Sequence, residues 1–146
     1  MPVSLDVPAY SSDEAPKTLL ITLTGTDRPG VTSTVFSTLA AFGGAVLDIE
    51  QIVLRRRLVL GVLVTAPRDW KALRAALERV GDELEMHVEV DRGTGDNRSR
   101  PQGRSHVTVL GTPLRAKAVA AIAGRIADSG ANIDRIERMA LSLIHI

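Results

Sequence analysis

The sequence contains no cysteine and very few aromatic residues, with one Trp, one Tyr and two Phe among 146 residues. The absence of cysteine excludes a disulfide scaffold, a thiolate zinc site and a cysteine nucleophile, and it fits a reducing compartment. An excess of one charge is also missing, because 18 basic residues balance 17 acidic ones for a formal net charge of +1. The balance argues against a dedicated nucleic-acid binder.

Long apolar runs are absent as well. Arg, Asp or Gly interrupts every apolar stretch, so none approaches the roughly 20 residues that span a bilayer. Residues 1–17 lack the basic and apolar regions of a signal peptide, so we expect a flexible leader. We expect a cytoplasmic protein without membrane contact, and its 45% hydrophobic residues suffice for one ordinary domain or two small ones.

Hydrophobic periodicity predicts the order β-α-β-β-α-β over residues 18–91. Alternating apolar residues from Thr18 predict a first strand, and Val31, Val35, Leu39 and Phe42 predict a helix that ends at Gly43 and Gly44. The remaining predicted elements are strands over Ala45–Leu54 and Leu58–Thr65, joined through Arg55, Arg56 and Arg57, then a helix from Trp70 capped by Asp69 and closed near Gly81, and a strand over Leu84–Asp91.

A second, shorter repeat follows a polar segment. Residues 92–103 contain no apolar side chain and are predicted to be a linker. Shifting the first domain by 86 residues aligns Ile21-Thr22-Leu23 with Val107-Thr108-Val109 and Gly44-Ala45 with Gly130-Ala131. The second repeat, 104–140, has a helical stripe of Val119, Ile122 and Ile126, with Thr112 predicted as N-cap and Pro113 as the first helical residue. It lacks a second half, so we expect a truncated repeat, and residues 141–146 look like a foreign tail.

The segment that invites a chemical interpretation is Gly25–Val31, between the first strand and the first helix. A helix start offers unpaired N–H groups and the positive end of the helix dipole to a carboxylate. Asp27 adds a group that can meet an ammonium, so the segment fits the head group of an amino acid. The alternative is that Asp27 only caps the helix, while Pro29 and the glycines only shape the turn.

Other chemistries fit the sequence less well. Val31-Thr32 follows Gly30 where a phosphate-binding P-loop needs lysine, and Asp27 stands where a dinucleotide fingerprint needs its central glycine. His87, His106 and His145 are scattered, so no metal site is predicted, and no serine or threonine has the setting of a nucleophile. The three arginines at 55–57 are interpreted as a solvated turn rather than an anion site. The sheet carries no aromatic platform for RNA bases.

A strand ending in glycine, then T-D-R-P-G-V, an amphipathic helix, Gly-Gly and V-L-D-I-E-Q together resemble the ACT domain, a sensor module of amino-acid metabolism. Two such repeats in tandem are most similar to the N-terminal regulatory half of phosphoserine phosphatases. The resemblance implies an α+β, ferredoxin-like fold with an antiparallel sheet in the order 4-1-3-2 and two helices on one face. It also implies homo-oligomers through ACT–ACT contacts.

The resemblance further implies a small amino acid, L-serine, as effector between domains. The residues matching its binding loops are Gly25, Asp27, Arg28, Pro29, Gly30, Val31, Gly111 and Thr112. The second loop departs from the pattern, since Pro113 and Ala116 replace Asp27 and Gly30, and we expect it to be scaffold.

The chain lacks the D-x-D-x-[TV] segment of the phosphatase nucleophile, so we expect neither phosphatase activity nor a cofactor in it. The Mg²⁺ of such enzymes would belong to a catalytic domain elsewhere. Two alternatives remain open: a stand-alone tandem-ACT regulator of the glycine-cleavage type, and the ACT head of a formyltetrahydrofolate deformylase.

Overall fold

The structure, a computed structural model, describes residues 16–95, 105–111 and 113–138. The chain divides into two compact units, residues 1–100 and 101–146, which are described separately. Most of the predicted leader and linker, Thr112 and the predicted tail 141–146 lie outside the described residues.

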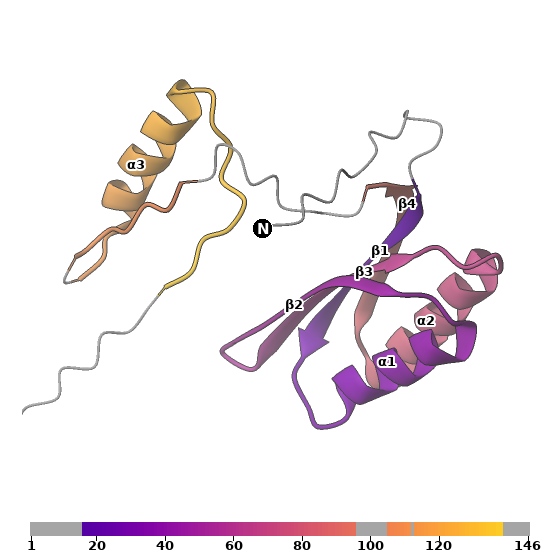
Figure 1. The fold of residues 1–146 in the computed structure, drawn as a ribbon. Coiled ribbons are helices and arrows are strands. Elements are labelled where there is room, and N and C mark those ends of the chain that lie inside the picture. The colour runs from indigo at the N-terminus through magenta and orange to yellow at the C-terminus, as the bar shows by residue number, and fades with distance from the viewer. Residues whose placement is uncertain (1–15, 96–104, 112, 139–146) are drawn as a thin grey trace, which may run out of the picture. The chain divides into compact units, whose positions relative to one another are not determined.

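The first unit has the predicted order of elements. It forms one four-stranded antiparallel sheet in the order β2-β3-β1-β4, which is the 4-1-3-2 arrangement expected from the resemblance. Figure 1 shows both helices on the same face of this sheet. The elements are β1 (Lys17–Thr26), α1 (Val31–Phe42), β2 (Val46–Leu54), β3 (Arg57–Thr65), α2 (Trp70–Leu84) and β4 (His87–Thr94).

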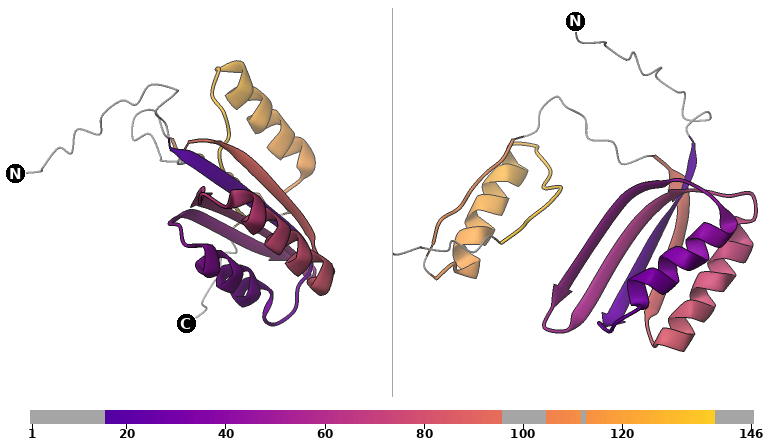
Figure 2. Two further views of the ribbon diagram at one scale, coloured as in Figure 1. Left: turned by 90° about the vertical axis from the view of Figure 1, so that its right-hand side faces the viewer. Right: turned by 60° about the horizontal axis from the view of Figure 1, so that its bottom comes forward.

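The hydrophobic core lies between the sheet and the two helices. Alternation along the central strands places one set of apolar side chains on the helix side, where they are buried. The helices add residues at spacings of three and four, which is the periodicity that predicted them. Both views in Figure 2 show the opposite face of the sheet uncovered by either helix of this unit. The fully buried side chains include Leu19, Ile21, Leu23, Leu58, Leu60, Val62, Val31, Val35, Leu73 and Leu77.

The predicted end of the second helix and both predicted ends of the last strand are wrong. Helix α2 continues through Gly81 to Leu84, because Gly81 is a packing glycine: a Cβ there would lie 2.6 Å from Val88 Cγ2 and 2.9 Å from the Met86 carbonyl oxygen. Leu84 is therefore the last helical residue and not the first residue of the strand. Strand β4 continues three residues past Asp91, because Arg92, Gly93 and Thr94 still pair with β1.

The β2–β3 turn is shorter and less relaxed than predicted. Only Arg55 and Arg56 form it, while Arg57 already belongs to β3. Both turn residues have positive φ, 47° and 65°. Two-residue hairpin turns of this type favour Asn-Gly, because the left-handed region costs energy for residues with a Cβ atom, whereas glycine and asparagine tolerate it.

We therefore expect the double substitution Arg55→Asn/Arg56→Gly to stabilise the chain by about 1 to 2 kcal/mol. Urea unfolding followed by circular dichroism measures the change. Arg57→Asn is the control, because it removes one neighbouring arginine charge outside the positive-φ positions and gains nothing from relief of strain. An unchanged or lower free energy of unfolding in the double variant would contradict this account of the turn.

The second unit contains α3 (Ala116–Asp128). The predicted stripe of Val119, Ile122 and Ile126 is partly buried, and no residue of the helix is fully buried. The helix begins after Arg115 rather than at Pro113. The alanine-rich sequence that favours a helix starts at Ala116. Residues 105–111 and 131–138 form no strand. None of the helices within the described ranges is long and apolar enough to cross a membrane.

Candidate functional site

The candidate site is the loop that carries the chain from β1 into α1. Gly25 ends the buried part of β1, and Val31 opens α1 with its side chain in the core. Asp27, Arg28 and Pro29 lie between them and are exposed. The two ends of the predicted binding segment are thus anchored, while its middle faces outward.

The start of α1 is not capped by Asp27. The N-cap is Gly30, which has φ of 91° and no side chain to offer. Its carbonyl oxygen accepts hydrogen bonds from the amide of Thr34 at 3.0 Å and from the Thr34 hydroxyl at 2.7 Å. The carboxylate of Asp27 makes no hydrogen bond or ion pair within the described part of the chain. The capping interpretation of Asp27 is therefore wrong, and the carboxylate is available for another role.

The backbone amides in the first turn of α1 therefore donate no hydrogen bond to the side chain of an N-cap residue. In an α-helix the first N–H groups have no partner one turn earlier, and here the amide of Val31 reaches only the Arg28 carbonyl oxygen, at 3.5 Å. The amides of Thr32 and Ser33 follow it at the positive end of the helix dipole. A carboxylate placed at this end would meet both hydrogen-bond donors and favourable charge.

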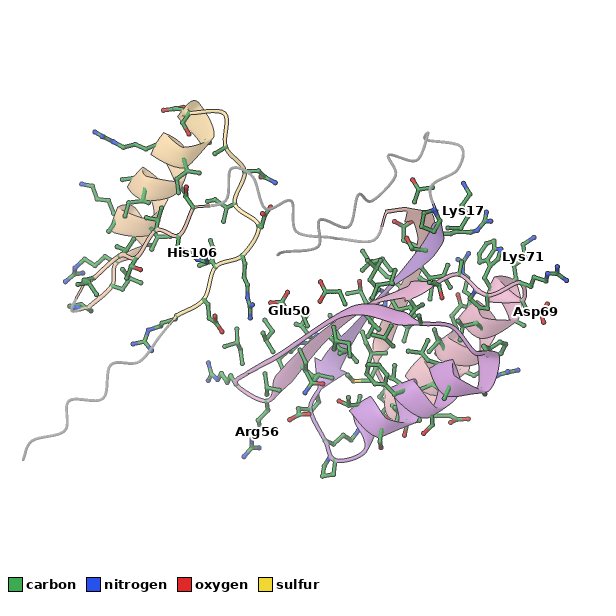
Figure 3. The ribbon with its side chains drawn as sticks, viewed as in Figure 1. Lys17, Glu50, Arg56, Asp69, Lys71 and His106 are labelled. Carbon is green, nitrogen blue, oxygen red and sulfur yellow. The ribbon has the colours of Figure 1, made fainter. Side chains whose placement is uncertain are left out.

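Two neighbours hold the loop from opposite sides. The amide of Asp27 donates a hydrogen bond of 2.7 Å to the Arg56 carbonyl oxygen at the tip of the β2–β3 hairpin. The Arg28 guanidinium donates to the carbonyl oxygen of Leu84, the last residue of α2. Figure 3 marks the hairpin tip by its labelled Arg56. Arg28 therefore fastens the loop to the C-terminal end of α2, where a cation is favoured.

Gly25 packs against the side chain of Met86. A Cβ at this position would collide with the sulfur of Met86, whose side chain is buried beneath the start of the loop. The end of β1 thus lies beside Met86, the residue that precedes β4.

Thr32 and Gln51 form a polar pair that sequence reasoning missed. The Thr32 hydroxyl donates a 2.7 Å hydrogen bond to Gln51 Oε1, which links the first turn of α1 to the edge strand β2. Gln51 pairs with the buried Leu60 across β3, so it lies on the helix side of the sheet. A glutamine on the helix-facing side of a mostly apolar strand is the signal that could have revealed it.

The other predicted residues are not brought to this loop. Gly111 lies in the second unit, in an exposed segment, and Thr112 is outside the described residues. His87 and His106 are exposed, with His87 Nε2 lying 3.1 Å from Glu89 Oε1, and His145 is not described. The described residues contain no group of three His, Cys, Asp or Glu side chains arranged to hold a metal ion.

Comparison with known proteins identifies the module. A family model described as ACT domain matches residues 17–91, and a second ACT domain model matches residues 104–142. The chain belongs to the ACT domain family. The resemblance read from T-D-R-P-G-V is thereby confirmed, together with the ferredoxin-like fold.

Two curated relatives match most of the chain. A phosphoserine phosphatase of Streptomyces coelicolor is 54% identical over 125 residues, covering 84% of this chain and 30% of that protein. Phosphoserine phosphatase SerB2 of Mycobacterium tuberculosis is 42% identical over 125 residues, covering 81% of this chain and 30% of that protein. The chain thus spans less than a third of these relatives.

The fold also has relatives among solved structures. One described as a glycine cleavage system transcriptional repressor superimposes with a TM-score of 0.53 at 20% identity, covering 57% of this chain and 50% of the other. At this identity the likeness shows a shared fold and leaves the ligand undefined.

Proposed function

We propose that this chain is an amino-acid-sensing regulatory module, with the effector held at the β1–α1 loop. The observation that carries the proposal is the pairing of an unengaged carboxylate, Asp27, with the uncapped first turn of α1. A zwitterion has opposite requirements at its two ends, an acceptor for the ammonium and donors for the carboxylate. This loop supplies both over a few residues.

Each part of the loop has a role in the proposed complex. The amides of Thr32 and Ser33 receive the α-carboxylate, and the Asp27 carboxylate accepts hydrogen bonds from the ammonium. Pro29 and Gly30 set the turn between them, and Arg28 holds the loop against α2. Val31 anchors the helix end in the core.

Gln51 is placed to read the effector's side chain. Its Oε1 atom already accepts the Thr32 hydroxyl, so its amide nitrogen is left as a donor beside the first turn of α1. A side-chain hydroxyl could accept from that nitrogen, whereas alanine could not. This arrangement supports a small polar effector such as L-serine.

The edge strand β2 supports pairing between copies. Among the described residues no strand pairs with its outer side, and its helix-side residues Val46, Ile49 and Val53 remain 44% to 50% exposed. Unpaired edges with apolar side chains recruit further strands. A second ACT module added at β2 would lie beside Gln51 and close over the effector.

The relatives suggest the protein to which the module belongs. Removal of phosphate from phosphoserine yields serine, so a phosphoserine phosphatase regulated by L-serine would sense its own product. Binding would favour one arrangement of paired modules and shift the population of catalytic conformations. A stand-alone tandem-ACT regulator or the ACT head of a deformylase would bind an effector at the same loop but would regulate a different protein or activity.

Calorimetric titration of the purified chain with L-serine, L-alanine, glycine and L-phenylalanine tests the proposal. We expect saturable binding of L-serine and weaker binding of alanine, glycine and phenylalanine, whose side chains offer no hydroxyl to the Gln51 amide. Equal heats for all four amino acids, or none for any, would refute the sensor. If serine and alanine bind with equal affinity, the loop remains the proposed binding site and only the proposed role of Gln51 is refuted.

A further inference from the structure

The non-glycine residues with positive φ gather at the two turns that contact the β1–α1 loop. Among the described residues there are three: Arg55 and Arg56, with φ of 47° and 65°, and Glu85, with φ of 54°. The left-handed region costs energy for residues with a Cβ atom. Such residues persist only where the surrounding structure holds them, and they concentrate at ligand clamps and switch regions. Their contacts with the loop are therefore informative.

Arg55 and Arg56 form the turn on one side of the loop. The carbonyl oxygen of Arg56 accepts the amide of Asp27 at 2.7 Å, and Asp27 is the residue proposed to bind the effector's ammonium. Figure 3 labels Arg56 at this turn. Within the described residues neither arginine side chain makes an ion pair or a hydrogen bond. The polar contact between this turn and the loop is therefore the backbone hydrogen bond.

Glu85 forms the turn on the other side of the loop. It follows Leu84, whose carbonyl oxygen accepts the Arg28 guanidinium. It precedes Met86, whose buried side chain packs against Gly25. A Cβ built on Gly25 would also lie 3.4 Å from the Glu85 carbonyl oxygen. The left-handed Glu85 ends α2 and turns the chain into β4, so it sets where its two neighbours meet the loop.

Other positions of positive φ in the first unit carry glycine. Outside the loop and its two flanking turns, the described positions are Gly43, Gly44 and Gly95, with φ of 67°, 119° and 120°. Glycine adopts positive and negative φ about equally, whereas a residue with a Cβ atom is confined to a small left-handed region. The two turns that contact the loop are thus less stable than glycine would make them, and they have a narrower range of backbone conformations.

We propose that the three non-glycine residues of positive φ, Arg55, Arg56 and Glu85, are positioning residues for the effector loop. Their confined backbones hold the carbonyl oxygens that bind Asp27 and Arg28. This inference rests on the proposed function, because it takes the β1–α1 loop as the effector site. A loop that is held on both sides before the effector arrives loses less conformational freedom on binding. The strain in the turns therefore raises the affinity and lowers the stability.

Glycine variants separate positioning from a merely structural role. Arg56→Gly and Glu85→Gly should not lower the urea midpoint of unfolding, because relief of strain offsets the greater freedom of the unfolded chain. Both should weaken L-serine binding by about 3- to 10-fold, since part of the cost of ordering a backbone residue moves to the binding step. Calorimetric titration and urea unfolding measure the two effects.

Asparagine supplies the conservative variants. It keeps a Cβ atom and tolerates the left-handed region, so Arg56→Asn and Glu85→Asn should retain the affinity for L-serine. Each removes the same charge as the glycine variant at its position. Arg68→Gly is a further control, because Arg68 lies in the exposed turn between β3 and α2 and does not have positive φ. It should leave the affinity unchanged.

Hydrogen exchange without any amino acid tests the positioning itself. The amide of Asp27 donates to the Arg56 carbonyl oxygen, so its exchange reports the opening of that contact. We expect exchange about 3- to 10-fold faster in Arg56→Gly than in Arg56→Asn or the unsubstituted chain. The amides at the centre of β1 should keep their protection in all three proteins.

Several results would overturn the proposal. These are glycine variants that bind L-serine as tightly as the unsubstituted chain, equal losses of affinity in the glycine and asparagine variants, or an unchanged exchange rate at Asp27. A joint loss of stability and affinity in Glu85→Gly would make Glu85 a structural residue only. If the unsubstituted chain binds no amino acid, the proposed function is refuted, and the exchange rate at Asp27 decides separately whether the hairpin turn positions the loop.

Discussion

Replacing Leu77 with alanine is expected to lower the free energy of unfolding by about 2 to 5 kcal/mol. The side chain projects from α2 into the core and has no exposed surface. Its truncation removes apolar burial and leaves a cavity that the sheet on one side and α1 on the other can fill only in part. A loss of this size is a large part of the stability of a small domain.

Urea unfolding followed by far-UV circular dichroism measures the loss. Arg79→Ala is the matched control, because Arg79 is exposed on the same helix and its replacement should change stability by no more than about 0.5 kcal/mol. If Leu77→Ala were as mild as the control, the core would not lie between α2 and the sheet as described.

Replacing Asp27 with alanine is expected to weaken binding of the amino-acid effector by about 10- to 100-fold. This range follows from the loss of about 1.5 to 3 kcal/mol that a hydrogen bond to a charged group contributes. The substitution removes the acceptor for the ammonium and leaves the amides of α1 for the carboxylate. Stability should change little, since the Asp27 side chain is exposed and does not cap the helix.

Calorimetric titration with L-serine measures the affinity, and Asp69→Ala is the matched control. Asp69 is an exposed acid just before a helix, like Asp27, and its side chain makes no capping hydrogen bond. It lies before α2 rather than α1, so its loss should leave serine affinity unchanged. Equal affinity in the Asp27→Ala variant and the unsubstituted chain would remove Asp27 from the site.

The sequence determines the architecture of the first unit strongly, because patterning and packing point to the same elements. The alternation of Leu19, Ile21 and Leu23 and the stripe of Val31, Val35 and Leu39 both reappear as buried faces. Gly43 and Gly44 end α1 with positive φ, as predicted.

Errors arise where tertiary contacts override local preference. Gly81 reads as a helix terminator, yet it lies inside α2 because Val88 and the Met86 carbonyl leave no room for a side chain. Arg55 and Arg56 give no turn signal, yet they adopt positive φ because β2 and β3 already pair on both sides of them. Local propensity predicts neither the helical Gly81 nor the positive φ of Arg55 and Arg56.

The site was predictable as a segment and unpredictable as a set of contacts. The residues of Gly25–Val31 identified the loop. Only the structure shows that the N-cap of α1 is Gly30 and not Asp27. The bonds from Asp27 to Arg56 and from Thr32 to Gln51 join residues far apart in the chain. Such pairs follow from strand order and register, which local patterns do not encode.

Backbone NMR of the isotope-labelled chain during addition of L-serine tests most directly whether the β1–α1 loop is a sensor. The largest saturable shifts should fall on the amides of Thr32 and Ser33 and on Asp27, with a smaller response at the Gln51 side-chain amide. Saturable shifts confined to β4 or to the second unit, with the first turn of α1 unmoved, would contradict the account.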